Sequence, residues 1–439
     1  MAYSYDVRGE NPRLNKIFGR KKEIPQELLY SFFAMGITLL GDSSLYVLLP
    51  IYAQEIGIPI GLVGILLSIN RFIRLGTNQL VRNLYIKIGG KNLFLISIIL
   101  SSMTTFLYGL PVGFVVFMIA RAVWGGCWSS MRFVNFVKIG EYSNDHTRGK
   151  LTGIFNSIVR LGSLAATLMG GVCAELIGYR NTYYLFALLT ISICLPLVIL
   201  SSRKYGSDKQ EPEKDIEKIQ ENRDKDEKEY RDNTDKGVEL WSVYSFAFLN
   251  DWITNGLLTT TIGYILMIRF GTSINMLGFS IGVALVTSIL ASLRWLFYIL
   301  LPILFGTISD KYGRFILLFV FSIIQALSLI AIAYAKTFVV ISLAVVLAFA
   351  AATGLANILD ILAIGHQLAK KDKNILGYFM TYGDLGSAIG AAGGYSLAIS
   401  FGYTNIYLAS GILLLGMLGI AKKIRISNDK HGVQENESG

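Results

Sequence analysis

The sequence predicts an all-α membrane protein with twelve transmembrane helices, arranged as two pseudo-symmetric six-helix bundles. Composition is the first reason, because 53% of the 439 residues are hydrophobic and only 16% are charged, too few polar groups to cover a water-facing surface. The second is the recurrence of apolar spans of about twenty residues, the length that crosses a bilayer. The third is an internal repeat that divides the chain into two halves.

Twelve apolar spans follow one another along the chain. They are Leu28–Tyr52, Ile60–Leu80, Leu93–Leu110, Val115–Phe136, Leu151–Leu176, Tyr183–Leu200, Trp241–Met267, Ile281–Phe305, Phe315–Tyr334, Phe338–Leu359, Ile375–Ile399 and Thr404–Ile420. The residues before the first span are polar and lack the apolar core of a cleavable signal peptide, so we expect that span to direct insertion itself.

The internal repeat pairs residues 153–183 with 377–407 at a constant offset of 224 and without a gap. Eleven of the thirty-one positions are identical, which indicates an ancient duplication. The identical residues of the first copy are Gly153, Phe155, Leu161, Gly162, Ser163, Gly170, Ala174, Gly178, Tyr179, Asn181 and Tyr183. Arg160 of the first copy corresponds to Asp384 of the second. The repeat therefore predicts opposite charges at equivalent depths of two related halves.

A highly charged stretch separates the two halves. It is rich in Lys, Glu, Asp and Arg and almost free of apolar residues, which predicts a solvated linker. We expect an N-terminal six-helix bundle at 1–201, a charged cytoplasmic linker at 202–238 and a C-terminal six-helix bundle at 239–439. A regulatory role of the linker is the alternative to a plain tether.

Lysine and arginine concentrate in alternate loops, and cytoplasmic loops carry this excess in membrane proteins. The other loops hold only Arg180, Arg269 and Lys336. We therefore expect both termini in the cytoplasm, in a multi-pass protein of the plasma or inner membrane. The net charge of +10 follows from the same bias, and no nucleic-acid-binding motif accompanies it.

The loop after the eighth span reads Gly306-Thr-Ile-Ser-Asp310-Lys311-Tyr-Gly313-Arg314. It fits the pattern G-x-x-x-D-K-x-G-R, and with twelve spans, a charged central linker and duplicated halves the chain resembles the major facilitator superfamily. The resemblance implies that the five motif residues take part in gating and that the halves open alternately around a central site. The equivalent first-half loop keeps Lys87 and Gly89 but has Ile86 in place of the aspartate.

Two further elements resemble the drug:proton antiporters of this superfamily. Span 1 carries an Asp-to-Pro element, from Gly41-Asp42 to Pro50, and span 4 carries Arg121-Ala-Val-Trp-Gly125, which fits R-x-x-x-G. The resemblance implies that Arg121 is the charged partner of Asp42 and takes part in gating, and that the substrate is exported. Asp42 lies mid-span beside Ser43 and Ser44, where a proton and a cation compete for its carboxylate, so we expect it to be the main proton-coupling group. Span 5 has Thr167 where the antiporter pattern has proline, so proton-coupled uptake or anion exchange of an organic acid is the alternative.

Charged residues occur within or directly after eight of the twelve spans. Those away from the span ends, together with Asp360 directly after span 10, are Asp42, Arg71, Arg74, Arg121, Arg132, Arg160, Asp251, Arg294, Asp360 and Asp384. Each costs roughly 2.5–3.5 kcal/mol at the centre of a bilayer, so we expect all of them to face protein or water. Spans 3, 6, 9 and 12 carry no such charge. The pattern predicts that eight helices line a polar interior and that four shield it from lipid.

Arginines outnumber aspartates in this set by six to four. A bound anion is the natural complement of a buried cation without a partner, and arginine suits planar recognition of a carboxylate or phosphate. We expect a small organic anion, or an amphipathic molecule with an acidic group, as substrate. Its expected binding residues are Arg71, Arg160, Arg294, Asp251 and Asn255. The alternative is that the charges are struts that pair helices.

Arg74 and Asp384 are expected at matching depth on spans 2 and 11, which the family resemblance places face to face. The two residues would pair when the cytoplasmic side is closed and separate when it opens, which makes them a gating latch. Alternatively, Arg74 pairs with Asp42 and Asp384 is a second proton-coupling group.

Together these observations predict a secondary active transporter that moves its substrate by alternating access coupled to protons. A membrane enzyme is a remote alternative, because the three histidines, His146, His366 and His431, fall in or near predicted cytoplasmic segments. A non-transporting scaffold would have no use for interior charges. We expect no cofactor, no metal and no nucleic-acid partner. The expected partners of a monomeric chain are the substrate, protons and the bilayer.

Overall fold

The computed structural model describes residues 25–142, 145–201, 240–276, 279–370 and 375–419. The predicted linker at 202–238 lies outside the described residues. The elements are α2 (Gln26–Tyr52), η1 (Ile60–Leu62), α3 (Val63–Ile88), α4 (Gly90–Tyr108), α5 (Gly113–Tyr142), α6 (Asp145–Ile177), α7 (Tyr179–Ser201), α9 (Leu240–Asp251), η3 (Trp252–Leu258), α10 (Thr259–Phe270), β1 (Ser273–Met276), β2 (Phe279–Gly282), α11 (Val283–Tyr312), α12 (Arg314–Tyr334), α13 (Phe338–Lys370), α14 (Ile375–Ile389), η4 (Gly390–Gly394) and α15 (Tyr395–Phe401). A further apolar helix covers Tyr403–Gly419.

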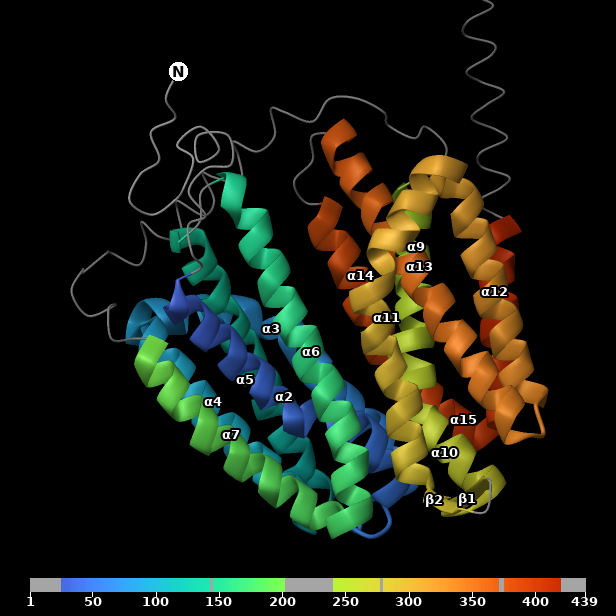
Figure 1. The fold of residues 1–439 in the computed structure, drawn as a ribbon, viewed down its shortest axis with the longest axis horizontal. Helices are drawn as coiled ribbons and strands as arrows, with labels where there is room; N and C mark the ends of the chain where they lie inside the picture. Colours follow the sequence, from blue (N-terminus) through green and yellow to red (C-terminus); the bar gives the residue numbers. More distant parts are fainter. Residues whose placement is uncertain (1–24, 143–144, 202–239, 277–278, 371–374, 420–439) are drawn as a thin grey trace, which may run out of the picture.

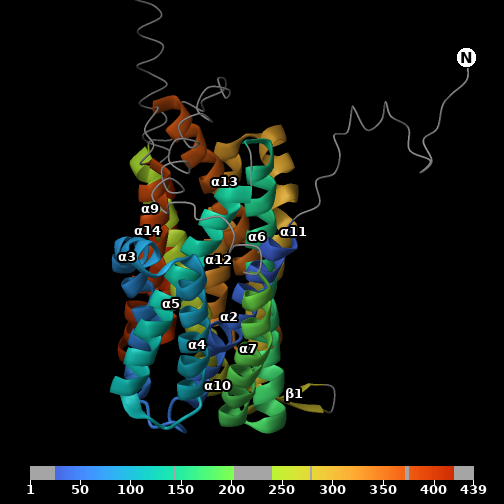
Figure 2. The same cartoon turned by 90° about the vertical axis from the view of Figure 1, so that its left-hand side faces the viewer.

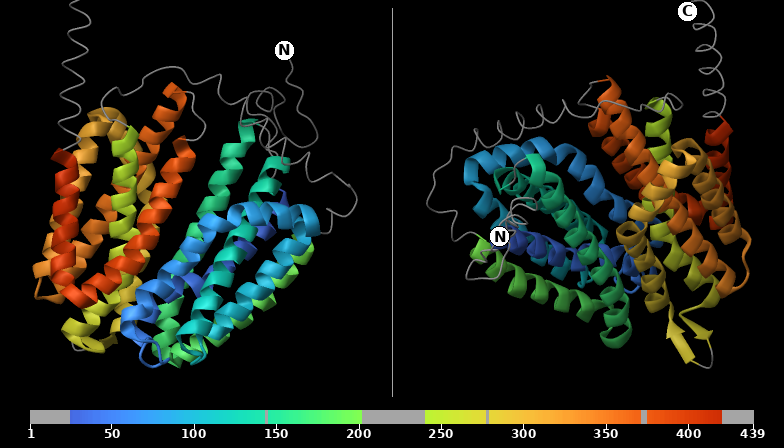
Figure 3. Two further views of the ribbon diagram at one scale, coloured as in Figure 1. Left: turned by 180° about the vertical axis from the view of Figure 1, so that it is seen from behind. Right: turned by 45° about the horizontal axis from the view of Figure 1, so that its top comes forward.

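The helices lie side by side in two groups, α2 to α7 and α9 to α15 (Figure 1). Figure 2 shows α4 and α7 on the outer face of the first group. The groups meet along α6 and α11 in Figure 1, and along α3 and α14 in the rear view of Figure 3. The ribbons converge at the end that holds β1 and β2, here called the hairpin end, and diverge toward the opposite end, where α9 begins.

Small residues bring the two groups into contact near the hairpin end. Gly64 packs so closely on η4 that a Cβ atom there would lie 2.5 Å from a backbone carbonyl oxygen. Gly171 of α6 packs in the same way on Ser288 of α11. The Ser396 hydroxyl also donates to the carbonyl of Gly61 at 3.3 Å. These contacts join first-group helices to second-group helices at this end.

Equivalent positions of the sequence repeat have the same local geometry. Gly178 and Gly402 each separate two consecutive helices with a φ of 82°, a left-handed conformation that favours glycine. A Cβ atom on Gly162 would collide with the backbone of α2, and one on Gly386 would collide with a carbonyl oxygen of α9. The second copy therefore packs α14 on α9 as the first packs α6 on α2.

Two helices of the second group contain π-helical segments. η3 joins α9 to α10, and η4 joins α14 to α15, each without a break. The segments touch, because a Cβ atom on Gly256 would lie 2.5 Å from the Cα of Gly390. Each segment divides one helix into short pieces. Counted as uninterrupted helices, nine in the described residues are long and apolar enough to cross a membrane.

The start of the eighth span differs from the sequence prediction. We expected it at Ile281, but Phe279–Gly282 forms strand β2, which pairs in antiparallel fashion with β1, and α11 begins at Val283. Gly271 ends α10 with a φ of 80°, so the chain leaves the helix and turns back as a hairpin before α11. A prediction from the periodicity of apolar residues cannot separate such a short strand from the apolar helix that follows it.

Candidate functional site

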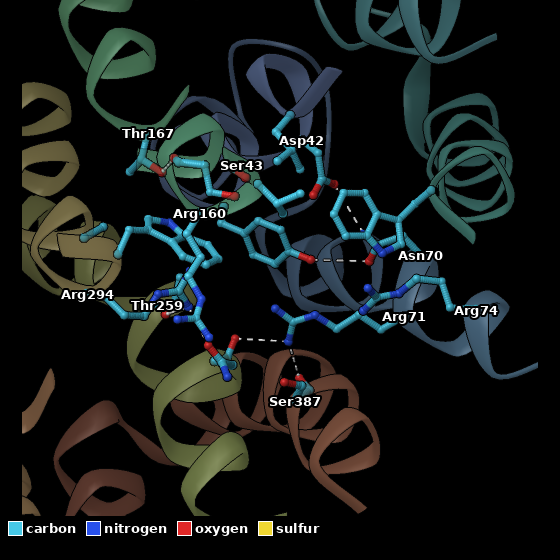
Figure 4. A pocket seen from close by; sticks show the side chains of 18 of the residues that line it. Asp42, Ser43, Asn70, Arg71, Arg74, Arg160, Thr167, Thr259, Arg294 and Ser387 are labelled. Carbon is cyan, nitrogen blue, oxygen red and sulfur yellow. Dashed lines mark hydrogen bonds between the residues drawn. The ribbon is translucent and has the colours of Figure 1, made fainter. Parts of the chain in front are cut away.

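A cavity of about 320 Å³ lies between the two groups of helices. α2, α3, α5 and α6 contribute from the first group, and η3, α10, α11 and α14 from the second. Figure 4 shows arginines from three helices, Arg71, Arg160 and Arg294, gathered around it. The charged lining residues are Asp42, Arg71, Arg74, Arg132, Arg160, Arg294 and Asp384. The lining is therefore predominantly cationic.

Arg294 of α11 is only 5% exposed. Its Nη1 donates to Oδ1 of Asn255 at 2.7 Å and to the hydroxyl of Thr259 at 3.0 Å. Its guanidinium also lies 4.2 Å from the centroid of the Trp295 ring, a favourable cation–π distance. These partners hold the side chain in place but none of them carries a negative charge.

Arg71 of α3 crosses to the second group of helices. Its Nη1 donates to the backbone carbonyls of Asn255 at 3.1 Å and Ser387 at 2.8 Å (Figure 4). The guanidinium lies 5.0 Å from the ring centroid of Tyr46. Asn255 is in η3 and Ser387 lies just before η4, so one arginine links α3 to both π-containing helices.

Arg160 of α6 also contacts the opposite group. Its Nη1 donates to the Tyr298 carbonyl of α11 at 2.8 Å, and its guanidinium lies 5.7 Å from the Tyr298 ring centroid. In the described part of the chain, no carboxylate lies within ion-pair distance of Arg71, Arg160 or Arg294. The structure thus brings the three expected substrate-binding arginines into one cavity, without counter-ions.

Asp42 and Arg121 form the ion pair that the family resemblance implied. Asp42 is 7% exposed and Arg121 is fully buried. Arg121 also donates to the carbonyl of Leu66 at 3.0 Å, and the side-chain amide of Asn70 donates to Asp42 at 3.3 Å. Oδ1 of the carboxylate therefore accepts hydrogen bonds from both Arg121 and Asn70 at the edge of the cavity. Its role in proton coupling stays a prediction.

Arg74 and Asp384 are also close, with Nη2 3.8 Å from Oδ1. The contact is longer than a hydrogen bond, and the side chains are 22% and 45% exposed. We expected this pair when the cytoplasmic side is closed. The contact is present here while the ribbons diverge at the end opposite the hairpin (Figure 1). The gating role of the pair stays a prediction.

A second cavity of about 290 Å³ adjoins the first, since Arg132 and Asp384 line both. It also contains Asp251, Asp360 and Tyr298. Asp251 was expected beside the substrate with Asn255. It lies in this neighbouring cavity instead, and is connected to the first only through the side-chain amide of Asn255, which donates to it. Among the described residues, neither lining draws on α4, α7, α12 or the helix 403–419.

A model of the Major Facilitator Superfamily matches residues 31–391, more than four fifths of the chain. The chain belongs to the major facilitator superfamily. This membership indicates a transporter rather than the membrane enzyme considered as an alternative, and a multi-pass membrane protein.

Curated relatives in this superfamily match only part of the chain. The quinolone resistance protein NorA of Staphylococcus aureus (strain Mu50 / ATCC 700699) is 23% identical over 180 residues, which cover 41% of this chain and 46% of NorA. NorA of strain MRSA252 is 24% identical over 194 residues, 43% of this chain and 50% of the relative. The chain thus spans about half the length of the curated relatives it matches.

Solved superfamily structures share the fold over nearly the whole chain. A POT family transporter in complex with 5-aminolevulinic acid has a TM-score of 0.68 at 16% identity, covering 92% of this chain and 96% of its own. A bacterial homologue of the human lysosomal transporter Spinster, in an inward-facing and occupied conformation, has a TM-score of 0.65 at 14% identity with the same coverage. At these identities the likeness concerns the fold alone.

The superfamily loop motif lies at the junction of α11 and α12. Gly313 separates the two helices with a φ of 89°, and its N–H closes α11 on the carbonyl of Ser309. Lys311 lies 5.3 Å from the ring centroid of Tyr312. Gly306 and Arg314 fall within α11 and at the start of α12, and the side chain of Asp310 lies outside what the structure describes. None of the described motif residues reaches either cavity, so gating by this loop stays a prediction.

The cavity of about 320 Å³ also has an aromatic side that the sequence did not predict. Tyr46, Trp124, Trp128, Phe155 and Trp295 all line it. Trp124 and Trp128 stand four residues apart on α5, with Arg132 four residues further on, so one face of the helix carries all three. That spacing was a readable signal, but aromatic residues at helical spacing more often mark a packed core than a site.

Proposed function

We propose that this protein is a secondary active transporter that moves a small organic anion, or an amphipathic molecule with an acidic group, by alternating access. The observation that carries the proposal is the set of three cavity arginines, Arg71, Arg160 and Arg294, which contact carbonyls, an amide and aromatic rings but no carboxylate of the described residues. Buried cations without counter-ions are costly, and a bound anion offsets that cost. Arg71, Arg160, Arg294 and Asn255 form the proposed binding residues.

The proposed transporter has twelve membrane crossings in two six-helix bundles. The two π-containing helices and the helix 403–419 would add three crossings to the nine long apolar helices of the described residues. The bundles would be 1–201 and 239–439, joined by a cytoplasmic linker at 202–238. Both termini would lie in the cytoplasm, and the monomeric protein would reside in the plasma or inner membrane. The shared packing of the two repeat copies supports this division.

Proton coupling is the proposed source of energy. Asp42 lies at the edge of the cavity, buried and paired with a cation, so protonation and ion pairing compete for the same carboxylate. Asp384, which contacts Arg74 across the two groups, is the proposed second coupling group. Intramembrane carboxylates of this kind mark proton pathways in transporters.

Efflux is the proposed direction. The partial similarity to NorA, a quinolone resistance protein, supports export over import. Uptake or anion exchange of an organic acid is the second candidate, because Thr167 stands where the antiporter pattern has proline. The sign of proton-driven flux in proteoliposomes of known orientation separates the two.

A thermal-shift screen of the purified full chain tests the anion proposal. Organic acids should raise the unfolding midpoint and their uncharged primary amides should not, because a ligand stabilises the state that binds it. Arg160→Gln and Arg294→Gln should each weaken binding of a stabilising acid about tenfold, the loss expected for one charge-assisted hydrogen bond. Arg180→Gln, an exposed arginine outside both cavity linings, is the matched control. Unchanged affinity in both cavity variants would refute the site.

A further inference from the structure

The aromatic rings of the cavity differ in what covers them. An arginine guanidinium lies 5.0 Å from the ring centroid of Tyr46 and another lies 4.2 Å from that of Trp295. Phe155 packs edge-on against two other phenylalanines. Trp124 and Trp128 stack on each other, with centroids 5.8 Å apart and an interplanar angle of 16°. No cation of the described residues lies over either indole.

Both indoles of this pair also have an unused hydrogen-bond donor. Nε1 of Trp124 and Nε1 of Trp128 are buried, and no described residue accepts a hydrogen bond from either. Trp124 is only 1% exposed, so its N–H has little access to bulk water. Leaving a buried donor unpaired is unfavourable, and such donors in native proteins call for an explanation. Both side chains line the cavity. A ligand that supplies acceptor atoms for these N–H groups would explain why they lack partners among the described residues.

Arg294, on the opposite group of helices, also has a buried donor without a partner in the described part of the chain. Nε of Arg294 is buried and has no partner among the described residues, although its Nη1 is engaged by Asn255 and Thr259. Nε of Arg74 on α3, which also lines the cavity, is likewise buried with no partner in that part of the chain. The unpaired groups that the described residues place around the cavity are therefore all donors, and they come from both groups of helices, α3 and α5 on one side and α11 on the other. A ligand that satisfies them needs acceptor atoms in at least two places.

We infer that the transported anion is a planar aromatic acid. Its ring lies against the Trp124–Trp128 pair, because aromatic rings favour offset stacking or edge-to-face contact with one another. Its acid group is bound by Arg294 and Arg160, and a second acceptor atom on the ring side receives an indole N–H. The inference rests on the proposed anion transport and narrows it to one class of substrate. The cavity of about 320 Å³ lies at the lower end of the range of pockets that hold drug-sized ligands.

Three matched probes test the inference by calorimetric titration of the purified full chain in detergent. 2-Naphthoate supplies both the acid and the aromatic ring, decahydro-2-naphthoate keeps the acid but has a saturated ring system, and 2-naphthamide keeps the ring but has no charge. We expect 2-naphthoate to bind about tenfold more tightly than either of the other two.

Variants of Trp128 test whether the indole pair recognises the aromatic ring of the probe independently of its carboxylate. Trp128→Leu should remove the preference for 2-naphthoate over its saturated analogue. Trp128→Phe keeps a smaller aromatic ring and should retain part of that preference. Trp241→Leu, at an exposed position outside both cavity linings, should change nothing. Gel-filtration profiles and unfolding midpoints show whether each variant folds.

The outcomes distinguish this inference from the proposed function. Equal binding of the two acids, with both weakened by Arg294→Gln, would refute the aromatic preference and leave the anion proposal standing. Equal binding of 2-naphthoate and 2-naphthamide, unaffected by Arg294→Gln, would refute the anion proposal itself. Absence of binding by all three probes at millimolar concentration would contradict both.

Discussion

Asp384 of α14 lies 3.8 Å from Arg74 of α3, and it occupies the position in the second repeat that Arg160 occupies in the first. Arg160 donates to the Tyr298 carbonyl of α11. Both repeat-equivalent side chains therefore reach from their own group of helices to the other group, although one is cationic and the other anionic. The duplication has kept the place of the crossing contact and inverted its charge.

Removing the charge of Arg74 tests whether its contact with Asp384 contributes to gating. Arg74→Ala should shift the protein toward the state that is open at the end opposite the hairpin, seen as faster labelling of a cysteine introduced at that end. The shift should be severalfold at most, because partly exposed ion pairs contribute about 0.2–1 kcal/mol. Cys127, Cys173 and Cys194 are first replaced to remove background labelling.

The double variant Arg74→Asp with Asp384→Arg restores opposite charges at the same two positions. It should transport better than either single variant, because only the double variant avoids two like charges. If the double variant is no better than the singles and labelling of Arg74→Ala is unchanged, the two residues do not act as partners.

Asp42→Asn should abolish proton-driven transport while leaving substrate counterflow measurable in proteoliposomes. The amide has nearly the same shape but can neither bind a proton nor balance Arg121. Loss of the buried ion pair also lowers stability, so the variant must be checked by gel filtration. Glu55→Gln, an exposed carboxylate outside both cavity linings, is the control. Wild-type coupling in Asp42→Asn would exclude Asp42 as the main coupling group.

Gly162→Ala should destabilise the protein by about 1–3 kcal/mol, the usual cost of overpacking. The new methyl group would collide with the backbone of Gly36 where α6 crosses α2. Gly153→Ala on the same helix meets no atom within 4 Å, and should be neutral or slightly stabilising, because alanine is the better helix former. Unfolding midpoints in one detergent compare the two variants. Equal midpoints would mean that α6 can move away from α2 without loss.

The interior charges allowed much of the site to be predicted from sequence. A charge inside an apolar span must face protein or water, and this rule indicated the lining helices and Arg71, Arg160 and Arg294. The placement of Asp251 could not be predicted in this way. A spacing of four puts Asp251 and Asn255 on one face of a regular helix, but η3 begins immediately after Asp251 and changes the hydrogen-bonding pattern to i→i+5.

Other features carried no usable signal. Strand β2 runs directly into the apolar helix α11, so the predicted eighth span included the last two residues of the strand, Ile281 and Gly282. The pairing of Trp124 with Trp128 was visible as a spacing, but their unpaired N–H groups depend on what surrounds them in three dimensions. Unsatisfied donors are a property of packing, which the order of residues does not reveal.

The π-helical segments make the two halves mechanically unequal. In the described residues, α2 and α6 are continuous α-helices, whereas their counterparts in the second half are interrupted by η3 and η4. Sharp bends in helices concentrate at such interruptions, and here the two interruptions face each other through Gly256 and Gly390. Bending is therefore expected at η3 and η4 in the second half, whereas α2 and α6 of the first half have no such interruption. Arg71 donates to a carbonyl within η3 and to a carbonyl of α14 three residues before η4, so bending of these helices would be transmitted to α3 in the first half.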